Sequence, residues 1–234
     1  MSRPRLLYVP ITAAREAERF AAQADWADVA SFDAPGAGAN RDLAPHGVAG
    51  VVEAARARLD ELAWETCGVV CESHGQAAAI ELALTEPDRV KGIFIGHAAA
   101  RYAVTGPRPA MSPSVRDVAG QLLETDYRAF ARAITQMTQG QMDDAYVDAW
   151  AADVPQPVAQ DLFGELSEEQ PGLVSRLAGS DLVIVLGEHR GCLMWTPEAF
   201  ADACEAVPEA RAVSCDGIPT EDPSFLDAVR TALT

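Results

Sequence analysis

Residues 68–75, Gly-Val-Val-Cys-Glu-Ser-His-Gly, lead into residues 76–84, Gln-Ala-Ala-Ala-Ile-Glu-Leu-Ala-Leu. The valine-containing run at 67–71 predicts a buried strand, and the alanine-rich run after it predicts a closely packed helix. A sharp turn with Ser73 at its centre joins the two. A strand, a tight turn and a helix in this order hold a serine hydroxyl above the edge of a sheet, where it can act as a nucleophile. Strand and helix nearly touch two positions after the serine, and Gly75 supplies the small residue needed there.

The composition predicts a single acidic domain with an ample core. The chain has 234 residues, of which 49% are hydrophobic, and no run approaches the roughly 18 apolar residues of a membrane span. Its formal charge of −17 argues against nucleic acid and anionic membranes as partners. The expected partner is a small-molecule substrate. The oligomeric state stays open, a homo-oligomer included.

Cysteine usage and the N-terminal segment predict a cytoplasmic protein. The five cysteines, an odd number, lack the close spacing of zinc ligands. The first residues lack the pattern of a signal peptide. We therefore expect a reducing compartment, no disulfide, no bound metal and no cofactor, since a dinucleotide fingerprint is also missing.

Strand and helix patterns alternate on both sides of a long helical stretch. Strands are predicted at residues 5–9, 26–32, 67–71, 90–96, 181–187 and 210–213, and helices at 12–23, 48–62, 76–84, 197–206 and 223–233. This alternation predicts an α/β protein with a mostly parallel sheet of about six strands and helices on both faces. Residues 101–179 show only helical periodicity. We therefore expect a core of residues 1–100 and 180–234, with 101–179 as a helical cap over the ligand-binding edge.

Four motifs together resemble those of the α/β-hydrolase family. Residues 33–38, Asp-Ala-Pro-Gly-Ala-Gly, resemble its D-x-P-G-x-G loop, and Ser73 stands where its nucleophile stands. Residues 86–90 resemble the turn after the nucleophile helix, and residues 185–189 resemble the strand leading to the catalytic acid. The resemblance covers nearly the whole chain. It implies an α/β-hydrolase fold with a helical cap.

The usual catalytic groups of that family are not in their usual places. The family carries His-Gly after its first parallel strand, where this chain has Pro10 and Ile11. The acid position falls on Arg190, and residues 214–222 hold no histidine where the base is expected. The resemblance implies an oxyanion hole from the backbone N–H groups of Ile11 and His74, with the His74 ring pointing away. Pro10 and Arg190 are expected to line the pocket.

A serine hydroxyl needs a base, so other residues are candidates for that role. His97 follows the strand beside that of Ser73, and Glu72 places a carboxylate in the same pocket. An alternative is a rearranged triad of Ser73, His189 and Asp216. Each residue also has a structural interpretation: Ser73 as a small residue in a strained turn, and the histidines as pocket or turn residues.

Three functions are consistent with these patterns. The first is an esterase, thioesterase or related acyl-transfer enzyme that acts on a small, largely apolar substrate with Ser73 as nucleophile. The second is a lyase, isomerase or cyclase that uses the same pocket for acid–base chemistry. The third is a catalytically silent ligand-binding scaffold. The serine at the turn favours the first, and His46 is expected on the surface, away from any of these sites.

Overall fold

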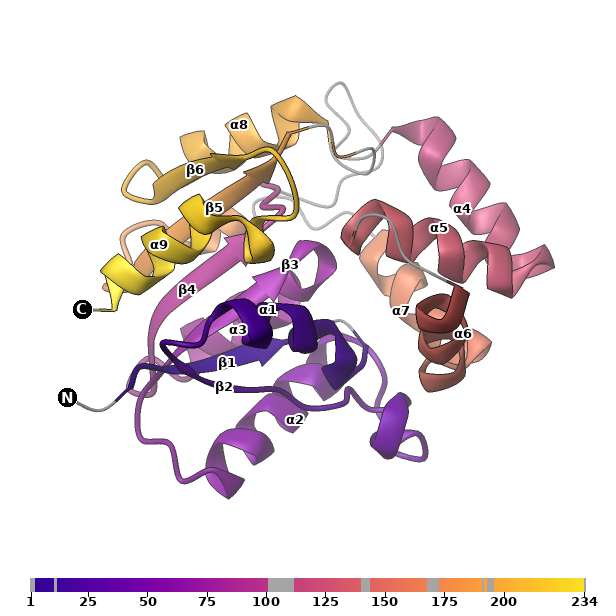
Figure 1. The fold of residues 1–234 in the computed structure, drawn as a ribbon, viewed down its shortest axis with the longest axis horizontal. Coiled ribbons are helices and arrows are strands. Elements are labelled where there is room, and N and C mark those ends of the chain that lie inside the picture. Colours follow the sequence, from indigo (N-terminus) through magenta and orange to yellow (C-terminus); the bar gives the residue numbers. More distant parts are fainter. Residues whose placement is uncertain are drawn as a thin grey trace.

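The computed structural model describes residues 3–10, 12–100, 112–139, 144–167, 173–190, 192 and 196–233. Within them, six strands form one sheet in the order β2-β1-β3-β4-β5-β6, and every neighbouring pair is parallel (Figure 1). The strands are β1 (Arg5–Val9), β2 (Asp28–Ala30), β3 (Cys67–Glu72), β4 (Val90–Gly96), β5 (Val183–His189) and β6 (Arg211–Cys215). This confirms the predicted fold class and the predicted parallel sheet.

Helices cover both faces of the sheet. The α-helices of the described residues are α1 (Glu18–Gln23), α2 (Val48–Glu61), α3 (Gln76–Thr85), α4 (Pro113–Thr125), α5 (Tyr127–Gln139), α6 (Asp144–Asp153), α7 (Gln156–Ser167), α8 (Pro197–Ala206) and α9 (Pro223–Ala232). Alternate strand residues pack on opposite faces: Leu7 and Val9 lie in the cluster with α2, α3 and α8, while Leu6 and Tyr8 lie in the cluster with α1 and α9. A parallel sheet buried on both faces explains why its strands are nearly continuous apolar runs in the sequence.

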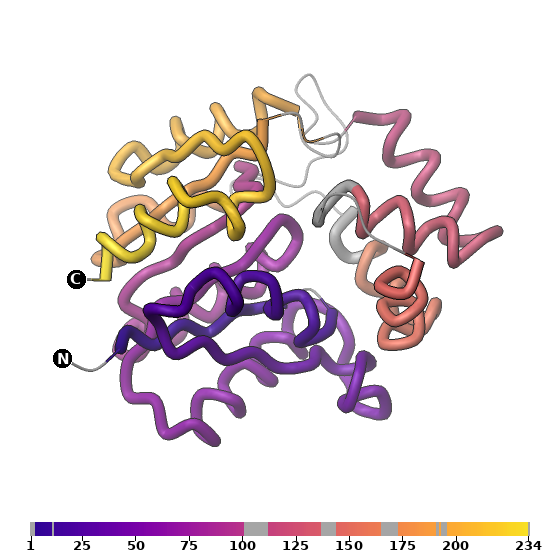
Figure 2. Tube along the Cα trace, viewed as in Figure 1, coloured from indigo at the N-terminus to yellow at the C-terminus, as the bar shows by residue number. Residues whose placement is uncertain are grey.

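Helices α4 to α7 form a group of their own. In Figures 1 and 2 they lie together on the right, on the side opposite to both chain termini. Their own apolar cluster includes Phe130, Val147 and Trp150. The sequence predicted a helical stretch at residues 101–179 but did not predict α7 as a separate helix. Pro157 stands in its first turn, where a backbone N–H has no partner within the helix and proline is tolerated.

The segment just before residue 179 packs against the sheet, while the predicted cap boundary itself stays a prediction. Leu173, Val174 and Leu177 precede that residue, and all three are buried in the large cluster against the sheet. Leu162 of α7 belongs to the same cluster. The helical group is therefore joined to the core by apolar contacts as well as by the chain.

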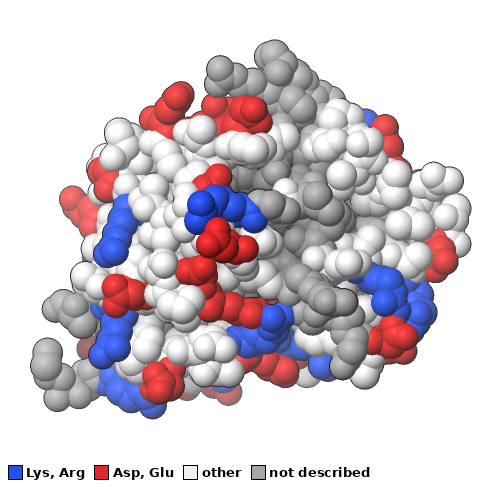
Figure 3. Space-filling view, turned by 45° about the horizontal axis from the view of Figure 1, so that its top comes forward, with Lys and Arg blue, Asp and Glu red and all other residues white. Residues whose placement is uncertain are grey.

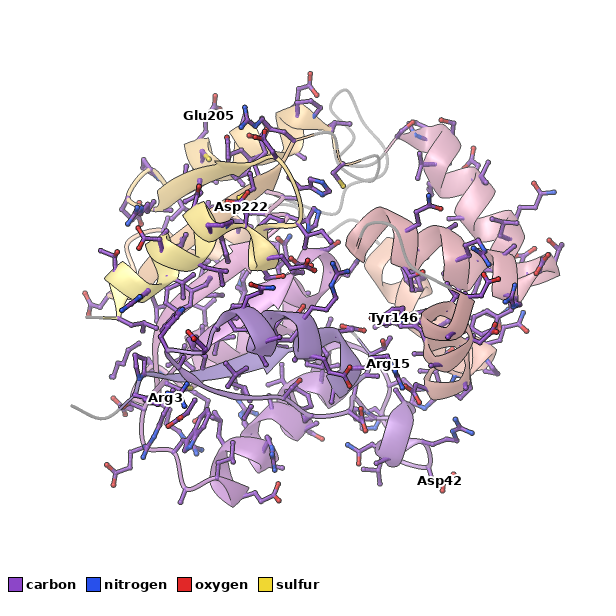
Figure 4. All side chains as sticks on the ribbon, in the orientation of Figure 1. Arg3, Arg15, Asp42, Tyr146, Glu205 and Asp222 are labelled. Carbon is purple, nitrogen blue, oxygen red and sulfur yellow. The ribbon has the colours of Figure 1, made fainter. Side chains whose placement is uncertain are left out.

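Polar contacts also tie the helical group to the loops that follow β1 and β2. Nε of Arg15 lies 2.8 Å from Oδ2 of Asp153, and its guanidinium lies 6.0 Å from the ring centre of Tyr146. Figure 4 shows Arg15 and Tyr146 on facing segments. His46 was expected on the surface. Its side chain is 29% exposed, and its Nδ1 lies 3.0 Å from Oδ2 of Asp161 on α7.

Negative and positive side chains are interspersed on the face that Figure 3 shows. On the face in Figure 3, acidic side chains lie beside arginines, in agreement with ion pairs such as Arg19–Glu221 at 2.5 Å. Among the described helices, none combines the length and the apolar composition needed to cross a membrane.

Candidate functional site

The predicted turn around Ser73 is present. Ser73 has a φ of 45°, in the left-handed region that non-glycine residues rarely adopt, and it joins β3 to the 3-10 turn Ser73–Gly75 and then to α3. A Cβ atom on Gly75 would lie 2.8 Å from the carbonyl oxygen of Val9 and 3.4 Å from Cβ of Cys71. Only glycine lets the turn pack this closely against the end of β1. The strand order reverses between β1 and β3, so Ser73 lies at the point where such sheets bind ligands.

The His74 ring lies beside Ser73 instead of pointing away as expected. Its Nδ1 is 3.1 Å from Oγ of Ser73, and its ring meets Phe163 of α7 edge-on, with ring centres 5.5 Å apart. Phe163 supplies an apolar partner on this side, which the sequence pattern around the turn does not reveal. Burial lowers the pKa of His74 to about 4. The imidazole is therefore neutral near pH 7, and its unprotonated nitrogen can accept the hydroxyl proton of Ser73.

Glu72, whose side chain is 9% exposed, has a carboxyl group that lies between Gly96 of β4 and the segment before α9. Its Oε1 accepts hydrogen bonds from Oγ1 of Thr220 at 2.6 Å and from the backbone N–H of Thr220 at 3.2 Å. Burial raises the pKa of Glu72 to about 7, while the bonds from Thr220 act in the opposite direction. Gly96 faces Glu72 across the ladder, and a Cβ there would lie 3.1 Å from Oε1. The glycine thus provides the space for this side chain.

His97 follows β4 and contacts both Glu72 and His189. Its Nε2 lies 2.6 Å from Nδ1 of His189, and its Nδ1 lies 3.8 Å from Oε2 of Glu72. Burial, followed by His189 and His74, lowers the pKa of His97 to about 3. Because His97 is then neutral, its approach to Glu72 is not an ion pair at neutral pH. Nδ1 has no hydrogen-bond partner among the described residues. Like Ser73, His97 has a positive φ, here 51°.

A cavity of about 140 Å³ opens beside the two histidines, between the ends of β4 and β5 and helix α8. The described residues in its wall include His97, His189, Arg190, Cys192, Thr196 and Phe200, and Ser73 is not among them. Arg190 lines this cavity, and its expected place in the pocket at Ser73 stays a prediction. Pro10 is buried directly after β1, and Ile11 is outside the described residues, so its predicted role in the oxyanion hole stays a prediction.

The structure does not assemble Ser73, His189 and Asp216 as a triad. Oδ1 of Asp216 lies 2.7 Å from the guanidinium of Arg190, and its side chain is 87% exposed. Nδ1 of His189 contacts His97 instead. Arg190 competes for the carboxylate because a guanidinium is always charged, whereas burial lowers the pKa of His189.

Cys192 belongs to this site although the sequence analysis did not select it. Its sulfur, one ring nitrogen of His97 and one ring nitrogen of His189 all lie within 4.8 Å of one another. The backbone N–H of Cys192 donates a hydrogen bond to the carbonyl oxygen of His189 at 3.2 Å, which keeps Cys192 near the end of β5. The spacing His-x-x-Cys at 189–192 was the available sequence signal.

No protein-family model and no curated protein sequence matches the chain. Solved structures do. An enol-lactonase from Burkholderia xenovorans matches with a TM-score of 0.74 and 18% identity over 100% of this chain and 92% of that one. A hydrolase from Oleispira antarctica has a TM-score of 0.77 and 11% identity over 100% and 88% of the two chains. An alpha/beta hydrolase from Sphaerobacter thermophilus has a TM-score of 0.66 and 20% identity over 99% and 91%.

These similarities extend over the complete length of the sheet and its helices. At such identities they establish the fold. The strand order, the turn at Ser73 and the similarity to solved structures all indicate the same fold. The chain therefore has the α/β-hydrolase fold, as the motifs of its sequence implied.

Proposed function

We propose that the chain is an enzyme that hydrolyses a small ester or lactone, with Ser73 as the nucleophile. The observation that carries this proposal is the geometry of Ser73: it has a φ of 45° at a strand-to-helix turn, with an imidazole nitrogen 3.1 Å from its Oγ. An enol-lactonase and an esterase from Thermogutta terrifontis, the latter with a TM-score of 0.72 and 14% identity over 100% of this chain and 92% of that one, support the reaction class.

His74 is the base in this proposal. As Oγ of Ser73 attacks the carbonyl carbon, Nδ1 of His74 takes the hydroxyl proton, and it later returns this proton to the leaving oxygen. Water then cleaves the acyl-serine by the same proton transfers. With a pKa of about 4, His74 takes up a proton only at a cost in free energy when no negative charge is nearby. The negative charge on the tetrahedral oxygen, held near the start of α3, favours the imidazolium that forms.

Helices α4 to α7 serve as the cap in this proposal. Phe163 of α7 packs on the His74 ring and so shields the reacting atoms from water. The predicted cap thus has its functional contact at α7. A cytoplasmic location and a homo-oligomer stay predictions from the sequence, and fractionation and gel filtration test them.

Covalent labelling tests the nucleophile and the base together. The folded protein is treated with a fluorophosphonate and its intact mass is followed with time. We expect one label per chain, no label in Ser73→Ala, and labelling at least about 100-fold slower in His74→Gln. His46→Gln is the matched control and keeps the normal rate, because His46 contacts Asp161 outside the site. Absence of labelling, or labelling that survives Ser73→Ala, contradicts the proposal.

A second candidate is a lyase or isomerase that moves a proton with the pair His97–His189. The cavity favours it, since both histidines line its wall and Ser73 is not among the described lining residues. Ser73 would then only donate a hydrogen bond. In that case His97→Ala abolishes turnover of the substrate, while Ser73→Ala leaves part of it and His46→Ala has no effect. If Ser73→Ala abolishes turnover and His97→Ala leaves part of it, the result supports the hydrolase.

A further inference from the structure

We propose that His97, His189 and Cys192 bind a divalent transition-metal ion of the zinc type. The two ring nitrogens and the sulfur lie within 4.8 Å of one another, at the end of β4 and in the turn after β5. Imidazole nitrogen and thiolate sulfur are the ligands that zinc prefers. The site is separate from the pair Ser73–His74, so it goes beyond the proposed ester hydrolysis.

The distance between the two histidine nitrogens fits such an ion after a small adjustment. Nε2 of His97 and Nδ1 of His189 are 2.6 Å apart. Two nitrogens bound tetrahedrally to zinc, at bond lengths of about 2.0–2.1 Å, are about 3.3 Å apart. The two rings therefore need to separate by about 0.7 Å, which a small rotation of the His189 ring provides. The sulfur of Cys192 lies within 4.8 Å of both nitrogens, and the backbone N–H of Cys192 is hydrogen-bonded to the carbonyl oxygen of His189.

Glu72 lies near His97, on the side where a metal-binding histidine needs a carboxylate. Such a histidine usually donates its second ring N–H to a carboxylate, which fixes the tautomer and the ring orientation. Nδ1 of His97 is buried, lies 3.8 Å from Oε2 of Glu72 and has no hydrogen-bond partner among the described residues. Thr220 holds Glu72 from the other side through two hydrogen bonds. This arrangement leaves Nε2 of His97 for the metal.

The neighbouring cavity provides room for a fourth ligand. Its volume of about 140 Å³ accommodates several waters or a small substrate, and Thr196 and Phe200 line it. Three protein ligands and an accessible fourth position are typical of catalytic zinc, which polarises a carbonyl or lowers the pKa of bound water. The ligand class expected beside the metal is therefore water or a small carbonyl or carboxylate oxygen.

Zinc titration of the full chain tests the site. The protein is dialysed against a chelator, its fold is checked by circular dichroism, and Zn²⁺ alone is titrated in competition with a chromogenic chelator. We expect one ion per chain, with affinity at least about 100-fold weaker in Cys192→Ser and His189→Gln and about 10–100-fold weaker in Glu72→Gln. Cys204→Ser and His46→Gln change the same residue types elsewhere and keep the affinity.

Cobalt adds a readout that a structural role of these side chains does not produce. With Co²⁺ in place of Zn²⁺, we expect a thiolate-to-metal charge-transfer absorption in the near ultraviolet, and Cys192→Ser loses it. The proposal is overturned if the folded protein binds no stoichiometric zinc. It is overturned equally if Cys192→Ser and His189→Gln bind zinc like the unmodified chain, or if the cobalt protein lacks the thiolate band.

Discussion

The carboxyl ends of two neighbouring strands, β3 at Ser73 and β4 at His97, share a backbone conformation but differ in their surroundings. Both residues have a positive φ, 45° and 51°, which costs an L-residue about 1–3 kcal/mol each. After Ser73 the chain turns tightly on Gly75 and the site is closed by Phe163. After His97 the site opens into a cavity beside His189. The same left-handed backbone conformation thus presents a hydroxyl group at Ser73 and an imidazole at His97.

The electrostatics of the two ends also differ. Beside Ser73 stands one neutral imidazole, that of His74, whose pKa is lowered by burial alone. Beside His97 stand a carboxyl group with a raised pKa and a second imidazole. The Ser73 end is suited to one proton transfer. The His97 end gathers several donor atoms, which suits a cation or a proton shared between groups.

Gly75→Ala tests the closed end and has the largest expected effect. The new Cβ would lie 2.8 Å from the carbonyl oxygen of Val9, so the turn must move. We expect a loss of about 3 kcal/mol in the free energy of unfolding, measured by urea denaturation, and loss of fluorophosphonate labelling. Gly120→Ala is the control, because nothing lies within 4 Å of its new Cβ, and it stabilises helix α4 by up to about 1 kcal/mol. Unchanged stability and labelling in Gly75→Ala would show that the turn is not tightly packed.

Acid sensitivity tests the burial of His74. The pKa is about 4 in the folded chain and about 6.5 in the unfolded chain, so the unfolded chain binds more protons below pH 6.5. The contribution of His74 to the free energy of unfolding is fully present above pH 6.5. It is lost as the pH falls from 6.5 to 4. Between pH 6.5 and 5 the loss is about 2 kcal/mol. Urea denaturation at both pH values is expected to show that His74→Gln loses less stability than the unmodified chain, by this amount. Equal losses in His74→Gln and the unmodified chain would contradict a buried neutral His74.

Gly96→Ala tests the open end with a smaller change. Its Cβ would lie 3.1 Å from Oε1 of Glu72, so the carboxyl group must give way by a few tenths of an ångström, which weakens its contact with Thr220 and changes its position near His97. We expect a destabilisation of about 1 kcal/mol and a zinc affinity lower by about 10-fold, while Ser73 is labelled at the normal rate. Slower labelling with unchanged zinc affinity would mean that Glu72 serves the serine instead.

Metal removal has the smallest expected effect on Ser73. Dialysis against a chelator removes an ion from the His97 end, while the pair Ser73–His74 keeps its 3.1 Å contact. The rate of fluorophosphonate labelling is therefore expected to stay within about twofold, compared before dialysis, after dialysis and after zinc is restored. A labelling rate that falls on dialysis and returns with zinc would show that the two ends act as one site.

Local patterns in the sequence predicted most of the framework. The first strand, residues 5–9, and the helix at 197–206 agree with β1 and α8 at both ends. The predicted strand at 26–32 is shorter in the structure, where β2 is Asp28–Ala30 and pairs with β1 alone at the edge of the sheet. An edge strand has one partner, so its length depends on that partner more than on its own apolar residues.

The sequence alone determined the parallel sheet, its helices and the serine turn, because apolar periodicity, proline and glycine act over a few neighbouring residues. Only the tertiary structure decided which side chains meet. Phe163 lies beside His74, Arg190 takes Asp216, and Cys192 approaches His97 from a distant part of the chain. These contacts depend on packing between segments far apart in sequence, and on charges that burial weakens, and neither is encoded in any short stretch.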